Sequence, residues 1–337
     1  MATEALTVHT LDDTAVDLSS ETLLEMHWQM VRARRADERL WALHRQGKIA
    51  FHISGIGQEG IQVGAAYAMR RGHDYASLYY RDVAFAFALG YTPREFYLAA
   101  FGKEGEPTSG ARQMPSHFSS RALGMLSSSS PVATQVPQAA GAALACKLRG
   151  EDRVTVVTLG EGATSEGDFY EGLNWAGVHR LPLVCLVQNN VYAISVPQHL
   201  QMAVPHVADR APMFGIAGAV VDGNDVLASY RVMKEAIQRA RDGGGATLVE
   251  AKTYRLVPHS SDDDDRSYRS RDEVEAWKQR DPIARFGAYL RERGLLDDDA
   301  LDEIERRVRQ EVDEAQAFAQ AVPYPPPEAA LGPVFKE

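Results

Sequence analysis

Short apolar runs alternate with longer segments of mixed polarity through the middle of the chain. Four of these runs are rich in Val, Leu and Ala and have the length of strands that are buried on both faces. Because segments of helical length lie between them, we expect a parallel sheet with right-handed crossovers. The expected strands are Arg153–Leu159, Leu181–Val187, Ala217–Gly223 and Ala246–Arg255.

Helix signals flank these strands. The segment Gln135–Arg149 has Pro137 in its first turn and many small residues, which favours a closely packed helix. Ser165 and Asp168 form an S-x-x-D start signal for a helix near Glu166–Val178. Further helices are expected at Asn224–Arg241 and, after Ser270, in EVEAWKQ and DALDEIERRVRQEVDEAQAFAQA, before a Pro-rich extended tail, PYPPPEAALGP.

The charge of the chain is unevenly distributed. Its 337 residues include 36 Lys and Arg and 46 Asp and Glu, which gives a net charge of −10. The first 31 residues hold six of the acids and no Lys or Arg. Binding a nucleic-acid backbone requires clustered basic side chains, so we expect no nucleic acid as a partner.

Composition also bears on location. No apolar run reaches the roughly 18 residues of a membrane-spanning helix, so we expect no membrane partner. The acidic N-terminus lacks the basic, apolar and small-residue order of a secretory signal, which predicts a cytoplasmic protein. The two cysteines, Cys146 and Cys185, lie far apart in apolar segments, where buried free thiols are expected.

Polar residues follow two neighbouring predicted strands. Gly160, Glu161 and Gly162 end the first, and Asn189 and Asn190 end the second. Ligands of parallel sheets bind at the carboxyl ends of the strands. A Gly-rich turn that runs into a helix offers backbone N–H groups to a phosphate, although the same glycines also suit a tight turn without a ligand.

Three phosphate sites can be compared with this pattern. A P-loop is excluded because Asp168 stands where the Lys is required. A dinucleotide site fits poorly, since Ser165 occupies the third glycine position and the second strand ends in amides rather than an acid. The third alternative uses Glu161 and Asn190 as hard oxygen ligands of Mg²⁺, which would bridge to a diphosphate.

The spacing and its flanks resemble a known family. G-E-G, 26 further residues and N-N are similar to the thiamin diphosphate motif, whose usual form begins G-D-G. From about Trp28 to the C-terminus the chain resembles alpha subunits of the decarboxylating component of branched-chain 2-oxo acid dehydrogenase complexes. The segments that carry this resemblance are RQMPSHF, SSPVATQVPQAAGAA, GEGATSEGDFYEGLNWA, QNNVYAIS, VDGNDVLASY and YRLVPHSSDDDDRSYRS.

The resemblance implies a three-layer α/β/α thiamin diphosphate-binding fold with a mostly parallel central sheet and a C-terminal helical segment. It divides the chain into four parts. These are an acidic N-terminal extension (1–27), a thiamin diphosphate and Mg²⁺-binding α/β domain (28–255), a catalytic loop (256–270), and C-terminal helices with the Pro-rich tail (271–337).

The resemblance also assigns the cofactor site. It makes Glu161, Asn190 and the backbone carbonyl of Tyr192 the Mg²⁺ ligands, and Arg81 and Arg255 the clamp on the diphosphate. Planar guanidinium groups suit a tightly held, doubly charged anion. Either Arg could otherwise be a surface ion pair. The neighbours of the diphosphate are Gly160, Gly162 and Ala163.

A second segment completes the implied cofactor site. Ser130 and Val132 resemble residues whose backbone groups contact the aminopyrimidine ring. Gln188 differs from the Arg or Glu that is frequent in related chains, so we expect it only to line the site. The residues that match a K⁺-binding loop are Ser129, Pro131, Thr134 and Gln135.

His259 is the expected catalytic residue, and Tyr80 is expected to shape the substrate pocket above the thiazolium ring. Acyl transfer requires a proton donor and acceptor whose pKa lies near the working pH, which suits histidine. The acids of 262–265 that follow could be a solvated turn or part of an ordered loop that docks the lipoyl domain. Ser260 and Ser270 match positions phosphorylated in animal relatives, but S-R-D-E is a capping box and we expect no phosphorylation.

The resemblance implies partners as well. The carboxylate that activates the cofactor belongs to a separate beta subunit in this family, so we expect an α2β2 heterotetramer. Its segments Ala122–Cys146 and Leu181–Ala208 suit the interface. The expected substrate is a small 2-oxo acid of the 2-oxoisovalerate type, and the acyl group passes to a lipoyl-bearing acyltransferase.

Three alternatives stay open at this point. The nearest is the alpha subunit of a pyruvate or acetoin dehydrogenase, although HSSDDDD favours the branched-chain type. A second is a cofactor-holding assembly subunit without a catalytic role. A nicotinamide dehydrogenase is the third and fits the glycine pattern least well.

Overall fold

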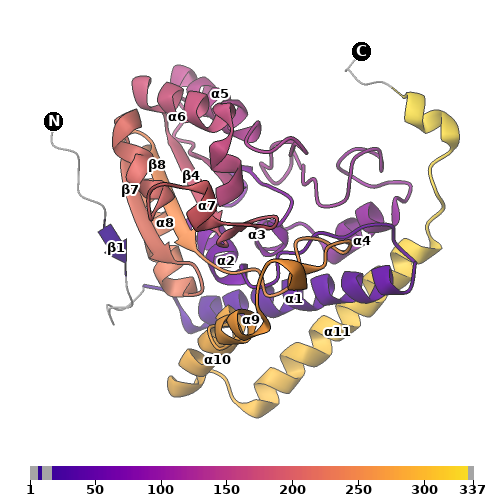
Figure 1. Cartoon of the computed structure of the whole chain (residues 1–337). Coiled ribbons are helices and arrows are strands. Elements are labelled where there is room, and N and C mark those ends of the chain that lie inside the picture. Colours follow the sequence, from indigo (N-terminus) through magenta and orange to yellow (C-terminus); the bar gives the residue numbers. More distant parts are fainter. Residues whose placement is uncertain (1–6, 10–16, 333–337) are drawn as a thin grey trace.

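A six-stranded parallel sheet forms the centre of the computed structural model, which describes residues 7–9 and 17–332 (Figure 1). The strand order is β1-β7-β8-β4-β3-β2. All of its pairings are parallel, which confirms the predicted parallel sheet. The strands are β1 (Thr7–His9), β2 (Tyr75–Ser77), β3 (Thr155–Gly160), β4 (Leu183–Asn189), β7 (Ala217–Asp222) and β8 (Thr247–Lys252), and a separate antiparallel pair is formed by β5 (Tyr192–Ala193) and β6 (Val196–Pro197).

Alternate residues of the central strands face opposite helix layers. Val184 and Leu186 of β4 belong to a core shared with α2 (Glu59–Ala68) and α8 (Val226–Arg241). Their neighbours on the same strand, such as Cys185, belong to a second core. That core is shared with α5 (Gln135–Arg149) and α6 (Gly167–Val178). Each buried Val or Leu stabilises the fold by about 1.5–3 kcal/mol. Helices therefore pack on both faces of the sheet, and the expected three-layer α/β/α fold is confirmed.

The first helix extends the body of the protein beyond the predicted boundary at residue 27. Helix α1 (Ser20–Arg45) has Ser19 as its N-cap, whose hydroxyl accepts a hydrogen bond of 3.2 Å from the backbone N–H of Thr22. Leu23 and Met26 are buried in the core, so residues 20–27 pack as part of the body. Of the rest of the predicted extension, residues 1–6 and 10–16 lie outside the described residues.

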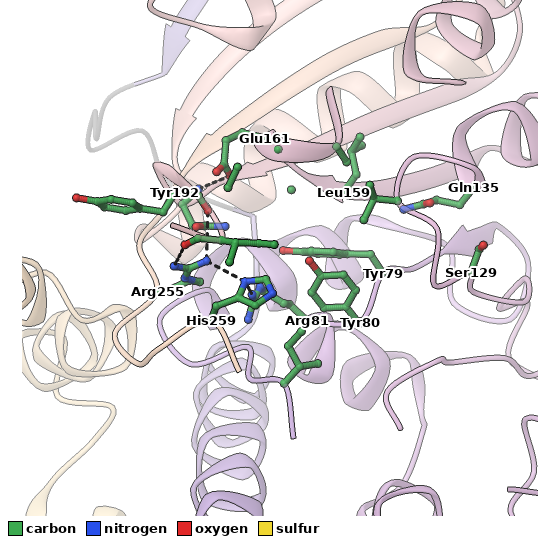
Figure 2. A pocket seen from close by; sticks show the side chains of 18 residues that line it. Tyr79, Tyr80, Arg81, Ser129, Gln135, Leu159, Glu161, Tyr192, Arg255 and His259 are labelled. Atoms are coloured by element: carbon green, nitrogen blue, oxygen red, sulfur yellow. Dashed lines mark hydrogen bonds between the residues drawn. The ribbon is translucent and has the colours of Figure 1, made fainter. Parts of the chain in front are cut away.

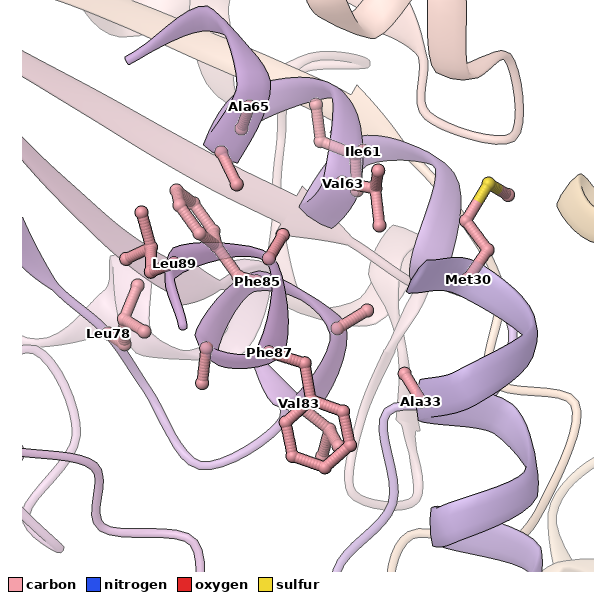
Figure 3. Close-up of a cluster of buried hydrophobic side chains, with 14 of the residues drawn as sticks. Met30, Ala33, Ile61, Val63, Ala65, Leu78, Val83, Phe85, Phe87 and Leu89 are labelled. Atoms are coloured by element: carbon pink, nitrogen blue, oxygen red, sulfur yellow. The ribbon is translucent and has the colours of Figure 1, made fainter. Parts of the chain in front are cut away.

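The core under the active-site edge is built where three helices meet (Figure 3). Met30 of α1, Ile61 of α2 and Phe87 of α3 (Val83–Leu89) are all buried there. The ring of Phe87 packs edge-on against Phe96 of α4 (Pro93–Phe101), with 5.6 Å between centroids. This packing fixes α3, which begins two residues after Arg81.

The C-terminal helices cover the amino-terminal one. The long helix α11 (Asp298–Ala321) lies along α1 (Figure 1), and Arg32 of α1 forms an ion pair of 2.6 Å with Glu311. The predicted extended tail is confirmed at 323–326 but is wrong for Pro327–Leu331, which forms a short 3-10 helix. No helix among residues 17–332 is long and apolar enough to cross a membrane. The remaining elements are α7 (Gln198–Gln201), α9 (Arg271–Lys278), α10 (Pro282–Glu292) and the 3-10 turns Glu161–Ser165, Val207–Phe214 and Asp265–Ser267.

The predicted start of α6 is wrong in one detail. Ser165 ends the 3-10 turn that follows β3, and Glu166 is the N-cap of the helix, without a side-chain cap. The turn forms because the hydroxyl of Thr164 donates to the carbonyl of Glu161 over 2.7 Å. Ser165 instead accepts a hydrogen bond of 3.1 Å from Gln201.

Candidate active site

A cavity of about 370 Å³ opens at the carboxyl edge of β3 and β4 (Figure 2). Most of the predicted site residues line it, whereas Ser130, Pro131 and Thr134 lie on the adjacent turn and do not. The predicted residues that it brings together are Tyr80, Arg81, Ser129, Val132, Gln135, Gly160, Glu161, Gly162, Ala163, Asn190, Tyr192, Arg255 and His259. Ile53, Tyr79, Leu159, Ala193 and Ile194 also line it and were not singled out by the sequence pattern.

Two buried oxygen atoms meet the requirements of a metal site. The carboxylate of Glu161 accepts a hydrogen bond of 3.1 Å from the backbone N–H of Asn190 through Oε2. Within the described chain, neither the other oxygen, Oε1, nor Oδ1 of Asn190 has a hydrogen-bond partner. Burial raises the pKa of Glu161, because water no longer stabilises its charge. Oxygen atoms of this kind are the ligands that Mg²⁺ prefers, so the residues fit the predicted metal.

The turn after β4 explains why two asparagines stand together. Oδ1 of Asn189 accepts a hydrogen bond of 3.0 Å from the N–H of Val191, which has a φ of 65°. A β-branched residue rarely adopts this left-handed conformation, and such strain clusters at functional sites. The turn leads directly to Tyr192, whose carbonyl accepts a hydrogen bond of 3.3 Å from Arg255 and keeps one lone pair for a metal.

The two glycines of G-E-G differ in their packing. A Cβ atom on Gly162 would lie 2.8 Å from Cβ of Ala193, so any side chain would push β5 away. A Cβ atom on Gly160 would make ordinary contact with the Tyr79 ring at 3.8 Å. The close approach at Gly162 brings the turns that follow β3 and β4 together.

Two guanidinium groups are buried beside this pair of turns. Arg81 and Arg255 are each 1% exposed. Arg81 donates to the carbonyl of Ser54 and Arg255 to that of Ile194, each over 2.8 Å. Neither forms an ion pair with any carboxylate of residues 17–332. Because buried arginines are rare unless they are paired, the cavity is prepared for an anion.

His259 lies between these two arginines. Its Nδ1 accepts hydrogen bonds from Arg81 over 2.8 Å and from Arg255 over 3.2 Å, so the ring is neutral and Nε2 carries its proton. Burial, Arg81 and Arg255 together lower the pKa of His259 to about 3. This differs from the expected pKa near the working pH, because burial and the two neighbouring cations all disfavour the charged ring.

The loop after His259 is held by part of its acidic run. Asp263 accepts a hydrogen bond of 2.8 Å from the backbone N–H of His259. Asp265 forms a buried ion pair of 2.7 Å with Arg269, which donates to the carbonyls of Arg255 and Val257. The interpretation of this run as a solvated turn is therefore wrong for Asp263 and Asp265 and holds only for the exposed Asp262 and Asp264.

The two serines of this loop have structural surroundings. Ser260 is buried, and Ser270 is the N-cap of α9, where its hydroxyl accepts a hydrogen bond of 3.1 Å from Glu273 N–H. The capping box is only half formed, because the Glu273 side chain accepts from the hydroxyls of Tyr192 and Tyr254 instead. The absence of phosphorylation stays a prediction.

The predicted K⁺ loop lies beside the cavity. The hydroxyl of Thr134 donates to the carbonyl of Pro131 over 2.9 Å, and Ser130 lies 2.6 Å from Nε2 of His117. Gln135 donates to Thr158, while its side-chain oxygen has no partner among the described residues. Groups of three or more His, Cys, Asp or Glu that could hold a metal are absent from the part of the chain described, but neither predicted ion requires one.

Gln188 does not line the cavity, contrary to expectation. The alternation along β4 turns its side chain away from the cavity, where it donates to Asp82, the N-cap of α3, over 2.5 Å and accepts from Gln62 of α2 over 3.0 Å. Gln62 also donates to the carbonyl of Arg81 over 3.0 Å, so this network fixes the loop that carries Tyr80 and Arg81. Burial raises the pKa of Asp82 to about 7. In front, the Arg81 guanidinium lies over the ring of Tyr80.

Comparison with known proteins finds relatives that span nearly the whole chain. The profile of the family described as "Dehydrogenase E1 component" matches residues 28–328. The chain is 47% identical over 325 residues to the 2-oxoisovalerate dehydrogenase subunit alpha of Bacillus subtilis, which covers 95% of this chain and 97% of the relative. It is 43% identical over 279 residues to the 3-methyl-2-oxobutanoate dehydrogenase subunit alpha of Mycobacterium tuberculosis, with 83% and 73% covered. Identity to the pyruvate dehydrogenase E1 component subunit alpha of Staphylococcus aureus is 37% over 302 residues, with 89% and 79% covered.

Proposed function

Because the chain belongs to the dehydrogenase E1 component family, we propose that it is the alpha subunit of a thiamin diphosphate-dependent, branched-chain 2-oxo acid dehydrogenase. One observation carries this proposal. In the described chain, two buried guanidinium groups without an ion-pair partner lie at the same cavity as two buried oxygen atoms without a hydrogen-bond partner. This is the charge pattern that a magnesium diphosphate would satisfy. The identity of 47% to the 2-oxoisovalerate dehydrogenase subunit of Bacillus subtilis, against 37% to the pyruvate dehydrogenase subunit of Staphylococcus aureus, favours the branched-chain substrate.

The chain's own residues would hold the cofactor in two ways. Glu161, Asn190 and the carbonyl of Tyr192 would bind Mg²⁺, and Arg81 and Arg255 would donate to the diphosphate oxygens. The backbone around Gly160, Gly162 and Ala163 borders the same space, and Val132 lies at its mouth. We propose Ser130 as an aminopyrimidine neighbour and Ser129, Pro131, Thr134 and Gln135 as K⁺ ligands on the resemblance alone.

When bound, thiamin diphosphate supplies the carbon nucleophile and the electron sink for loss of CO₂ from a 2-oxo acid. The protein's part is to orient and to move protons. His259 presents its protonated Nε2 as a donor, because Nδ1 is occupied by Arg81 and Arg255. Tyr80 and Tyr79, whose rings lie 5.1 Å apart, form an apolar wall that excludes water from the substrate.

The site requires a partner chain. Among the described residues that line the cavity, Glu161 alone carries a carboxylate, and this carboxylate would bind the metal. A second carboxylate to activate the cofactor must therefore come from another polypeptide, which supports a beta subunit and an α2β2 assembly. Exposed apolar side chains support this interface: Val132 and Ile194 line the cavity, and Val196 and Leu200 lie in the same predicted interface segment as Ile194, Leu181–Ala208. A lipoyl-bearing acyltransferase would receive the acyl group.

We also propose that the enzyme works in the cytoplasm. Both cysteines, Cys146 and Cys185, are free and buried, which suits a reducing compartment. Burial raises the pKa of both thiols, so neither is prepared as a nucleophile.

The test is reconstitution with a beta subunit. With thiamin diphosphate and Mg²⁺, we expect the assembly to release CO₂ from 2-oxoisovalerate faster than from pyruvate, whereas the chain alone should release none. Thiamin-dependent turnover by the isolated chain would contradict the shared active site. A preference for pyruvate would favour the alternative substrate. If NAD raised the melting temperature while thiamin diphosphate with Mg²⁺ did not, the dinucleotide reading of the glycines would replace this proposal.

A further inference from the structure

A charged side chain interrupts the apolar interior of the sheet. Glu250 lies in the middle of β8 between β4 and β7, and it is completely buried. It points to the same face as Leu248, two residues earlier, which belongs to the second core. Strands that are buried on both faces are normally continuous apolar runs, and an unpaired carboxylate there would be strongly destabilising. Glu250 therefore needs hydrogen-bond donors and an opposite charge close to its carboxylate.

Glu250 joins the two ends of one long segment. Its Oε1 accepts a hydrogen bond of 2.6 Å from the side chain of Asn189, which ends β4. Its Oε2 accepts one of 3.1 Å from the backbone N–H of Ala208, at the start of the following 3-10 turn. Lys252 balances the charge, with its Nζ 2.5 Å from Oε1. One carboxylate thus fastens both ends of residues 190–207, which we call the metal-binding segment.

The metal-binding segment has further braces but little regular structure. It contains the two-residue strands β5 and β6 and the four-residue helix α7. Gln198 accepts a hydrogen bond of 2.9 Å from Asn189 and donates one of 2.8 Å to the carbonyl of Pro205. Lys252 reaches the same carbonyl over 3.2 Å. These contacts form one network with Glu250, Asn189 and Lys252.

The segment carries functional groups at its beginning. Asn190 and Tyr192, the proposed Mg²⁺ ligands, are one and three residues after Asn189, and Ile194 lines the cavity. Asn189 also sets the strained turn at Val191 through its other side-chain atom. Because Glu250 fixes the amide of Asn189, it also fixes where Asn190 and Tyr192 lie.

We propose that Glu250 is a positioning residue that holds the metal-binding segment in place and so sets the affinity of the site for Mg²⁺. This inference rests on the proposed function. Gln in place of Glu250 keeps the size of the side chain but leaves a single acceptor oxygen, so it cannot serve both Asn189 and Ala208. One end of the segment is then released, and one of the buried N–H donors at that end loses its acceptor on residue 250.

The experiment uses the α2β2 assembly with the variants Glu250→Gln, Gln198→Ala and Asp74→Asn. Asp74 is the matched control, because it is also a buried carboxylate, but it pairs with Arg241 at the amino end of the sheet. Mg²⁺ is titrated by calorimetry at saturating thiamin diphosphate. Hydrogen exchange of residues 190–207 is measured separately without metal or cofactor.

For Glu250→Gln we expect at least a tenfold weaker Mg²⁺ affinity and faster exchange across 190–207. Gln198→Ala should change both in the same direction by a smaller factor, and Asp74→Asn should change neither. Unchanged Mg²⁺ affinity and unchanged exchange in Glu250→Gln would overturn the inference. If that variant does not fold, Gln198→Ala decides, since its side chain is only half-buried. If the unaltered assembly binds no Mg²⁺, the proposed function fails, while the exchange data still test the role of Glu250.

Discussion

The guanidinium of Arg81 donates a hydrogen bond of 2.8 Å to Nδ1 of His259. The proposed anion clamp and the proposed proton donor are therefore one connected unit. Because Arg255 donates to the same nitrogen, two positive charges oppose protonation of the ring. An anion that binds the arginines must also change the acidity of the histidine.

Binding of a diphosphate should raise the pKa of His259 from about 3 toward its ordinary value. The reason is that the anion neutralises the charge of the two neighbouring cations. We expect a rise of at least about one pH unit when thiamin diphosphate and Mg²⁺ saturate the assembly. Titration of the labelled imidazole by NMR measures it. A pKa that does not move at saturation would show that the anion binds elsewhere.

Replacement of Arg255 by Gln should weaken thiamin diphosphate binding by about 10- to 100-fold, since a charge-assisted hydrogen bond is worth about 1.5–3 kcal/mol. It should also raise the pKa of His259 in the cofactor-free protein, because one of the opposing cations is gone. Calorimetry measures the affinity. The control is Arg241→Gln, which removes an arginine whose side chain is only 6% exposed and pairs with Asp74 away from the cavity. Equal losses in both variants would indicate general destabilisation.

Replacement of Glu161 by Gln should separate stability from cofactor binding. The buried carboxylate is destabilising without a metal, as its raised pKa indicates, so the neutral amide should raise the melting temperature of the cofactor-free protein by about 2 °C. The further stabilisation by thiamin diphosphate and Mg²⁺ should be lost. Thermal unfolding with and without both ligands measures this. A variant that keeps the full ligand-dependent stabilisation would remove Glu161 from the metal site.

Replacement of His259 by Ala should lower the rate of acyl transfer to a lipoyl group by about 10²- to 10⁴-fold, the usual contribution of a positioned proton donor. The assembly should still form and still bind Mg²⁺, because no proposed metal ligand is altered. Steady-state rates of the reconstituted complex measure the effect. Full activity would support the alternative of a non-catalytic assembly subunit.

Acid should destabilise the protein partly through His27. Burial lowers the pKa of this histidine to about 4, below the 6.5 that it has when unfolded. Between these pH values the unfolded chain binds the proton and the folded chain does not, so stability falls as the pH drops from 6.5 toward 4. The contribution is on the order of 2 kcal/mol at pH 5.

His27→Gln should therefore flatten the dependence of unfolding free energy on pH in this range, as measured by urea unfolding at pH 7 and pH 5. The exposed His199 provides the control variant, His199→Gln. If both variants keep the same slope as the unaltered protein, His27 does not cause the acid sensitivity.

The central sheet and the two turns that carry Glu161 and Asn190 could be predicted because their signals are local. Runs such as 181–187 are apolar throughout, and Glu161 and Asn190 follow directly after neighbouring strands. Helix α5 has the predicted bounds Gln135–Arg149, since Pro137 and Gly150 mark its two ends. Strand β2 has only three residues, which is too short for a periodic pattern to indicate.

Other features depend on contacts between residues that are distant in the sequence. Gln188 looks like a cavity residue because it precedes Asn189, yet the period of two along β4 turns it toward Gln62. Helix α1 crosses the expected boundary at residue 27 because Leu23 and Met26 are needed in the core, although the acidic residues around them suggest an extension. A local sequence pattern shows neither the contact of Gln188 with Gln62 nor the packing of Leu23 and Met26 in the core.

The groups that would bind one cofactor come from four separate strand ends: Arg81 follows β2, Glu161 follows β3, Asn190 follows β4 and Arg255 follows β8. Parallel strands of this kind form from distant contacts, and those contacts form slowly during folding. A newly made chain in which any one of the four strands has not yet formed would have no complete anion site. Cofactor affinity is thus a test of finished folding, and during biosynthesis the cofactor would selectively stabilise only those chains whose sheet is complete.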